Sequence, residues 1–138
     1  MENYEVFEHT ADIGIRVRGK DLKSLFRNAS LAMFQISAAK KSTKDIKYKK
    51  ISIAQEAESL DELFVNWLNE LLSLSAVKGL IFDDFKINRL GSKKLEAIAV
   101  GADIKNYKLN LEIKAATYCN LKLSRTKSGW KAEVILDV

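Results

Sequence analysis

The stretch SLDELFVNWLNELL, residues 59 to 72, encodes a long amphipathic helix and thereby decides much of the fold. Its apolar side chains recur at the three- and four-residue spacing that gathers them on one face of a helix. They are Leu60, Leu63, Phe64, Trp67, Leu68, Leu71 and Leu72. Ser59 and Glu62 form a capping box, in which each side chain accepts a hydrogen bond from the main-chain amide of the other. So wide an apolar face predicts a helix packed on a sheet, with Trp67 as a core anchor rather than a ligand-stacking residue.

A second helix is predicted over residues 21 to 37, and strands account for most of the remaining pattern. Asp21 is the expected N-cap of that helix, whose apolar residues again follow a helical spacing. The segment EHTADIGIRVRG, residues 8 to 19, alternates between apolar and polar side chains instead, which places Asp12 on the face away from the core. With the alternating segment at 46–53 and those that follow the long helix, the pattern predicts about seven strands.

Two amphipathic helices and about seven strands indicate an α+β fold in a single domain spanning residues 1–138. The length of 138 residues is typical of one domain, and the chain has no proline and no Gly/Ser-rich linker. A strand-helix-strand order surrounds each predicted helix, as duplicated strand-helix-strand-strand units would show. The composition, 47% hydrophobic and 30% charged, is typical of a folded, soluble protein.

The apolar segments predict neither secretion nor membrane insertion. MENYEVFEHT lacks the basic start and apolar run of a signal peptide. The apolar region at 63–77 is interrupted by polar residues and is shorter than a membrane span. We therefore expect a cytoplasmic protein. Cys119 is the only cysteine, which excludes an internal disulfide and a cysteine-based zinc site, and the alternating strand around it predicts a half-buried, inert thiol.

The net charge of +5 is concentrated in KKSTKDIKYKK, residues 40 to 50, which contains six lysines. In one interpretation this run is a solvated edge. In the other, its screened positive field attracts phosphate backbones or an acidic protein surface. Lys47, Lys49 and Lys50 are then the residues expected to steer docking. The run lacks the interleaved aromatic residues and arginines of a surface that binds single strands by stacking.

The carboxylates carry the most specific chemistry, because the usual catalytic motifs are missing. There is no P-loop, no G-x-G-x-x-G after a strand and no nucleophile elbow, and His9 is the only histidine. If the first and last strands are neighbours, Asp12, Asp137 and the terminal carboxylate of Val138 could bind a hard cation such as Ca²⁺ or Mg²⁺. In the alternative interpretation Asp12 only shapes a turn and His9 is a partly exposed bystander. The acidic pair at 83–84 is expected to form a turn.

Several stretches together resemble the archease family. They are HTADIGI at 9–15, GKDLKSLFRNASLAMFQI at 19–36, DELFVNWLNELL at 61–72, IKAATYCNLKL at 113–123 and VILDV at 134–138. The segments follow the family's order and cover nearly the whole chain, and HTADIG and NWLNELL are the more specific ones. The resemblance implies an α+β sheet assembly built from related strand-helix-strand-strand units.

The same resemblance implies an accessory factor rather than an enzyme. In this family a small protein promotes guanylylation of the GTP-dependent RNA ligase of the RtcB type, which joins tRNA halves and other broken RNAs, and thereby allows multiple turnovers. The ligase is the implied partner, with its GTP and RNA involved indirectly. The resemblance further implies a divalent-cation site at Asp12, Asp137 and Val138, described with calcium, for which magnesium or manganese are alternatives. His9 would support that site.

Two departures from the family pattern concern histidines. Cys119 follows Tyr118 where family members commonly have a histidine, and the loop GADIKNYKLNLEIK at 101–114 lacks another. If those histidines help at the ligase's active site, this chain would be a divergent or less active member. Two other functions stay open: a metal-dependent phosphoester hydrolase with His9 as acid or base, and a basic RNA-binding or chaperone-like module without metal chemistry.

Overall fold

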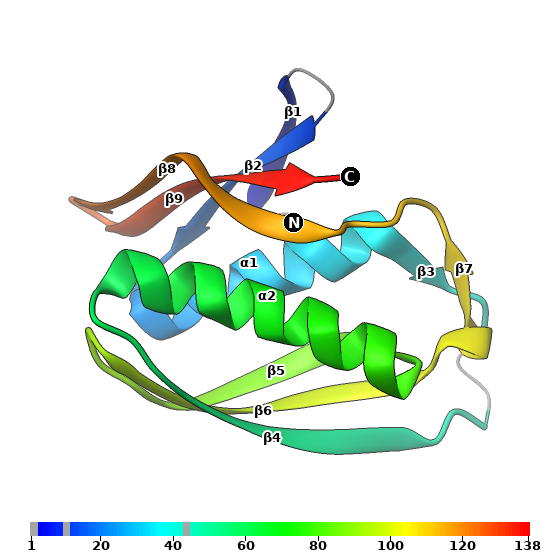
Figure 1. Ribbon diagram of the computed structural model, residues 1–138. Helices are drawn as coiled ribbons and strands as arrows, with labels where there is room; N and C mark the ends of the chain where they lie inside the picture. The colour runs from blue at the N-terminus through cyan, green and yellow to red at the C-terminus, as the bar shows by residue number, and fades with distance from the viewer. Residues whose placement is uncertain (1–2, 10–11, 43–44) are drawn as a thin grey trace.

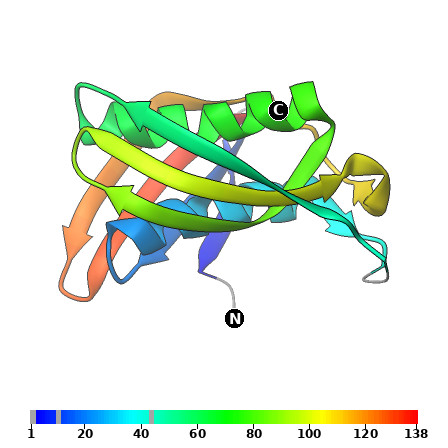
Figure 2. The same ribbon diagram turned by 90° about the horizontal axis from the view of Figure 1, so that it is seen from below.

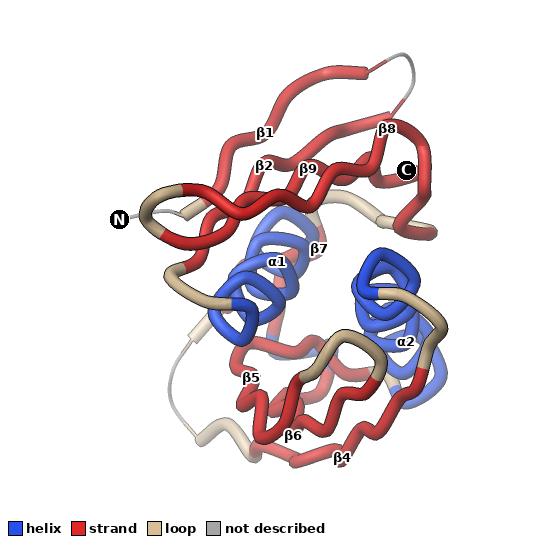
Figure 3. Tube along the Cα trace, turned by 90° about the vertical axis from the view of Figure 1, so that its left-hand side faces the viewer, coloured by secondary structure: helices blue, strands red, loops and turns tan. Residues whose placement is uncertain are grey.

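Two helices lie between two β-sheets, so that the chain forms three layers (Figure 1). A computed structural model describes residues 3–9, 12–42 and 45–138. Within these ranges there are nine strands, two α-helices and one short 3-10 helix. A four-stranded sheet covers one side of the helices and a three-stranded sheet covers the other, as Figure 3 shows along the helices. The expected α+β fold is confirmed. No helix among the described residues combines the length and the apolar character that crossing a membrane requires.

The four-stranded sheet brings the N-terminal and C-terminal strands together. Its order is β1-β2-β9-β8, and all neighbouring strands are antiparallel. Its strands are β1 (Tyr4–His9), β2 (Asp12–Gly19), β8 (Ala115–Thr126) and β9 (Gly129–Asp137). The predicted alternation of β2 is confirmed, because Ile15 and Val17 are fully buried. Residues of the other parity, such as Asp12, therefore lie on the outer face of this sheet.

A bulge interrupts β8 where it runs along β9. The register shifts between Thr117 and Lys122, and Asn120 has a φ of 52°, in the left-handed region. Residues that leave a ladder in this way no longer alternate between core and solvent. Cys119 lies in the bulge and is exposed, so the prediction of a half-buried thiol is wrong.

The three-stranded sheet also contains a bulge, at the acidic pair that was expected to form a turn. The order of this sheet, which Figure 2 shows in front of the helices, is β4-β6-β5. Its strands are β4 (Tyr48–Glu56), β5 (Leu80–Leu90) and β6 (Lys94–Asp103). The register shifts between Phe82 and Asp84, which leaves Asp83 outside the regular pairing with β6. The expected turn is thus wrong: β5 continues through both aspartates because the bulge accommodates them.

Both helices begin at the caps that their sequences predict. The helix α1 (Leu22–Ser37) has Asp21 as its N-cap, whose side chain accepts a hydrogen bond from the amide of Ser24 at 2.8 Å. The helix α2 (Leu60–Lys78) starts at Ser59, which caps the Glu62 amide at 3.2 Å. The other half of the capping box differs by one residue, because Glu62 accepts from the amide of Glu58 instead. Gly79 ends α2 with a φ of 64°.

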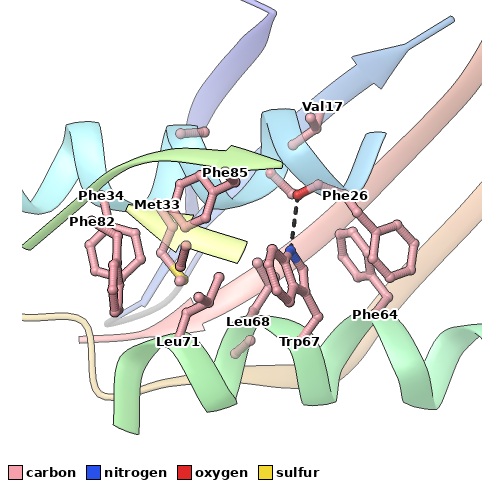
Figure 4. Packing of buried hydrophobic residues seen from close by; sticks show 14 of the residues in the cluster. Val17, Phe26, Met33, Phe34, Phe64, Trp67, Leu68, Leu71, Phe82 and Phe85 are labelled. Carbon is pink, nitrogen blue, oxygen red and sulfur yellow. Dashed lines mark hydrogen bonds between the residues drawn. The ribbon is translucent and has the colours of Figure 1, made fainter. Parts of the chain in front are cut away.

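The core fills the space between the layers and is centred on aromatic side chains of both helices (Figure 4). Trp67 of α2 is fully buried, and its indole N–H donates to the carbonyl oxygen of Phe26 in α1 at 3.1 Å. The rings of Phe26 and Phe64 meet edge to face with centroids 5.1 Å apart. The predicted role of Trp67 as a core anchor is confirmed.

Two strands of three residues account for the excess over about seven predicted strands. They are β3 (Ala38–Lys40), which follows α1, and β7 (Tyr107–Leu109), which follows the 3-10 helix η1 (Ile104–Asn106). The two strands pair with each other. Strands so short leave almost no alternation to detect. The strand-helix-strand units also differ in pairing: β4 and β5, which flank α2, share a sheet, whereas β2 and β3, which flank α1, do not.

Candidate functional site

Asp12 and Asp137 lie directly opposite each other on neighbouring antiparallel strands. The register of β2 and β9 pairs Asp12 with Asp137 and the next residue, Ile13, with Leu136. Leu136 is fully buried, so the two aspartates lie on the outer face of the sheet. Asp12 is half-buried and Asp137 is exposed. The condition set by the sequence, that the first and last strands be neighbours, is therefore met through β2.

Two carboxylates in this relation fit a divalent cation by their chemistry. Like charges directly opposite on a strand pair repel and destabilise the sheet, and a cation between them removes that cost. Carboxylate oxygens are also the ligands that calcium and magnesium prefer. Among the side chains that the structure describes, no three His, Cys, Asp or Glu residues form a cluster suited to a metal ion. Further oxygen ligands would thus have to come from the main chain, the chain terminus or water.

Main-chain contacts hold the end of β9, and one side chain of α2 holds the neighbouring part of β8. The amide of Lys114 donates to the carbonyl oxygen of Asp137 at 2.8 Å, and Val138 packs its half-buried side chain against the core. Asn69 bonds both main-chain groups of Ala116: its amide nitrogen donates to the carbonyl at 3.1 Å, and its oxygen accepts from the N–H at 2.8 Å. Asn69 thus fixes the part of β8 that runs beside Asp137.

Asn69 is a positioning residue that the sequence analysis did not identify. It interrupts the apolar stretch of α2, and this interruption is the only signal that the sequence offers. A half-buried asparagine in such a stretch needs partners for both its amide and its carbonyl group. The partners lie on a strand far away in the sequence, so the signal indicates a polar contact without identifying it.

His9 is the last residue of β1 and pairs with Asp12 in the register of β1 and β2. This pairing places His9, Asp12 and Asp137 in one row across three strands. The side chain of His9 lies outside the part of the chain that the structure describes, so its predicted supporting role stays a prediction.

Four positions along β2 from Asp12, Arg16 joins three strands on the outer face. Its guanidinium group donates to Glu133 of β9 at 2.6 Å and lies 3.6 Å from the carboxylate of Glu5 in β1. It also lies over the ring of Phe7, 4.3 Å from the centroid. The hydrogen bond from Arg16 lowers the pKa of Glu133 below its ordinary value. This contact fixes the alignment of β1, β2 and β9 from which the row of His9, Asp12 and Asp137 follows.

The lysines expected to steer docking lie in another layer. Lys49 and Lys50 belong to β4, and Lys47 precedes it; all three are exposed. They are thus associated with the three-stranded sheet, across the helices from the sheet that carries Asp12 (Figure 1). Lys40, the first lysine of the run, is engaged differently: its ammonium group lies 2.9 Å from Asp83 and donates to the Tyr48 hydroxyl at 2.7 Å.

Comparison with known proteins identifies one family. Residues 4–138 match the Archease protein family (MTH1598/TM1083). The chain is similar to Protein archease of Methanosarcina barkeri, with 35% identity over 99% of this chain and 97% of that one. It is also similar to Protein archease of Pyrococcus furiosus, with 36% identity over the full length of both.

Two solved structures share the fold. The solution structure of Methanobacterium thermoautotrophicum protein 1598 matches with a TM-score of 0.76 and 30% identity over the whole of both chains. The crystal structure of a Thermotoga maritima protein, described as an archease and possible chaperone, matches with a TM-score of 0.69 and 24% identity, covering 97% of this chain and 96% of that one. The second likeness concerns the fold alone.

Proposed function

Because the chain belongs to the archease family, we propose that it is an accessory protein that activates a GTP-dependent RNA ligase of the RtcB type. In this proposal it promotes guanylylation of the ligase in tRNA splicing and RNA repair, and thereby allows repeated turnover. The observation that supports it most is the direct opposition of Asp12 and Asp137 on β2 and β9. Two residues that the family resemblance implies as cation ligands, from opposite ends of the chain, lie side by side.

Three oxygen-bearing groups would hold the cation: the carboxylates of Asp12 and Asp137 and the terminal carboxylate of Val138. They suit calcium, with magnesium or manganese as alternatives, because hard cations take oxygen ligands. A cation bound there would neutralise negative charge that develops during phosphoryl-type transfer. The protein's own part is positioning: the Arg16 contacts and the Asn69 clamp keep the row of residues aligned on a rigid sheet.

The proposal is tested by counting RNA joins per molecule of the cognate ligase. We compare the wild-type protein, Asp12→Ala, and a matched control, Asp61→Ala, in which an exposed aspartate at the start of α2 is removed instead. We expect the wild-type and control proteins to raise turnover above one join per ligase, and Asp12→Ala to leave it at the level without any added protein. Circular dichroism checks that each variant is folded.

Each alternative function has a distinct result in the same assay. Full stimulation by folded Asp12→Ala would refute a role for the aspartate pair. Absence of stimulation by the wild-type protein would refute ligase activation itself and favour the binding or chaperone-like module. Hydrolysis of phosphoesters by the protein alone in Mg²⁺ or Mn²⁺, abolished in His9→Ala, would establish the hydrolase instead.

A further inference from the structure

A cavity lies at the opposite end of the β2–β9 ladder from Asp12 and Asp137. It has a volume of about 550 Å³ and lies where β2 leads into α1 and β8 turns into β9. The charged residues that line it in the described part of the chain are cationic: Arg18, Lys20, Arg27 and Lys131. No aspartate or glutamate lines it among the described residues. The volume is in the range of sites for small ligands.

Two of these cations form a like-charge pair across the sheet. Arg18 is the direct partner of Lys131 in the register of β2 and β9. Like charges directly opposite destabilise a strand pair unless a counter-charge lies between them. Neither side chain forms an ion pair in the part of the chain that the structure describes. The pair therefore has the arrangement that an anion would stabilise.

The charged groups nearest this pair are already engaged. Arg27 binds Asp84 at 2.8 Å and the carbonyl oxygen of Phe85 at 3.0 Å. Asp21, next to Lys20, accepts a hydrogen bond from the amide at the start of α1. Glu133, which follows Lys131 by two residues, is bonded to Arg16. Among the described residues, Arg18, Lys20 and Lys131 are thus the lining cations that form no ion pair within 4 Å.

Two glycines allow the main-chain segments at the wall of the cavity to pack directly against each other. A Cβ atom on Gly129, which has a φ of 144°, would collide with the carbonyl oxygen of Gly19 and lie 2.8 Å from the Cα of Lys20. A Cβ on Gly19 would likewise collide with the first turns of α1. The β8–β9 turn is therefore seated directly on the segment that carries Arg18 and Lys20. Trp130, which follows this turn, is half-buried against the core.

We propose that this cavity binds a phosphate group of RNA, with Arg18, Lys20 and Lys131 on the phosphate. Cations that contact phosphates supply the sequence-independent part of nucleic-acid binding. In the lysine run at 40–50, by contrast, Lys49 and Lys50 lie opposite Gly101 and Val100, so no like-charge pair forms across those strands. A free nucleotide offers the same chemistry, and the experiment distinguishes it from RNA. The proposal does not depend on ligase activation, because the isolated protein is tested.

The test measures the affinity of the full-length protein for a fluorescein-labelled oligouridine of about ten nucleotides by fluorescence anisotropy at several salt concentrations. The variant Arg18→Gln/Lys131→Gln is compared with the matched control Lys49→Gln/Lys50→Gln, which loses the same charge from β4. We expect the dissociation constant to rise at least tenfold in the first variant and less than twofold in the control. The slope of log K against log salt should decrease by about 0.7 in the first variant, since the site neutralises one phosphate and each phosphate contact contributes about 0.7 for single strands.

Two further measurements separate the possible outcomes. GMP and inorganic phosphate serve as competitors: GMP that binds as tightly as RNA, with the same sensitivity to Arg18→Gln/Lys131→Gln, identifies a free nucleotide as the source of the phosphate. Equal RNA affinity of wild-type and variant proteins, or a larger loss in the Lys49/Lys50 control, would overturn the proposal. A thermal melt confirms folding and should show no destabilisation, since the substitution removes a repulsion.

Discussion

The two ends of the β2–β9 ladder carry pairs of like charges with opposite sign. At the C-terminal end of β9, Asp12 is opposite Asp137; at the other end, Arg18 is opposite Lys131. The two pairs lie six positions apart along β2, which corresponds to about 20 Å along a strand. Both pairs lie on the same face, because they are an even number of residues apart.

Between the two ends, the charges are complementary. Arg16 is opposite Glu133 in the same ladder, and the two groups are joined by a hydrogen bond of 2.6 Å. An opposite-charge pair needs no ligand, whereas a like-charge pair is destabilising without a counter-ion. In the two proposals, one strand pair presents two ligand classes, and the sign of the paired charges selects between a cation and a phosphate.

The largest effect is expected at the acidic end. In Asp12→Asn/Asp137→Asn, the dissociation constant for Ca²⁺ or Mn²⁺ should rise about a hundredfold or more, since the loss of groups that merely orient metal ligands already costs about 10- to 100-fold. Calorimetric titration measures the effect.

The matched control for this variant is Glu58→Gln/Asp61→Asn, which neutralises two exposed carboxylates near the start of α2. It should bind the cation like the wild-type protein. If Asp12→Asn/Asp137→Asn binds the cation as tightly as this control, the acidic end is not the cation site. The proposal that the two ends of the ladder bind different ligands is then wrong.

An intermediate effect is expected when the hydrogen bonds from Asn69 to the main chain of Ala116 are removed. Asn69→Ala should lower the free energy of unfolding by about 1 to 3 kcal/mol, because it leaves the N–H and C=O of Ala116 without their partner. Urea denaturation measures the change. The matched control is Asn66→Ala, one turn earlier on α2, where we expect a smaller effect.

Asn69→Ala should also affect ligand binding at the two ends of the ladder differently. Asn69→Ala should weaken cation binding beside Asp137 while it leaves RNA affinity at the cavity near Trp130 unchanged. Equal losses at both ends would show that the two ends are not independent and that the clamp acts on the sheet as a whole.

The smallest effect concerns the complementary pair in the middle and depends on pH. Arg16 lowers the pKa of Glu133 below its ordinary value of 4.5 in the folded state. The ion pair therefore stabilises the fold above that pH, and this contribution is lost as the pH falls through the lowered pKa. Solvent screens a partly exposed pair, so the difference in melting temperature between wild-type protein and Glu133→Gln should be small at pH 7 and vanish in strong acid. A difference that persists or increases in acid would contradict the assigned role of this carboxylate.

Local patterns allowed the helices and most strands to be predicted from the sequence. Asp21, Ser59 and Gly79 mark helix ends because capping depends on residues within one turn. The alternation in β2 assigned Asp12 to the outer face for the same reason. The errors occurred at bulges: Asp83 and Cys119 lie where an extra residue breaks the alternation, and that break arises from the pairing with a partner strand.

The sequence by itself thus determined the α+β class, the starts of both helices and the faces of most strands, and the resemblance singled out the two aspartates as candidate ligands. Only the tertiary structure decided that Asp12 lies opposite Asp137 and Arg18 opposite Lys131. These pairings depend on β9 lying between β2 and β8 in one particular register, which neither segment specifies alone. A strand's own residues encode which side faces the core, whereas its register also depends on the neighbouring strands and the helices packed beneath them.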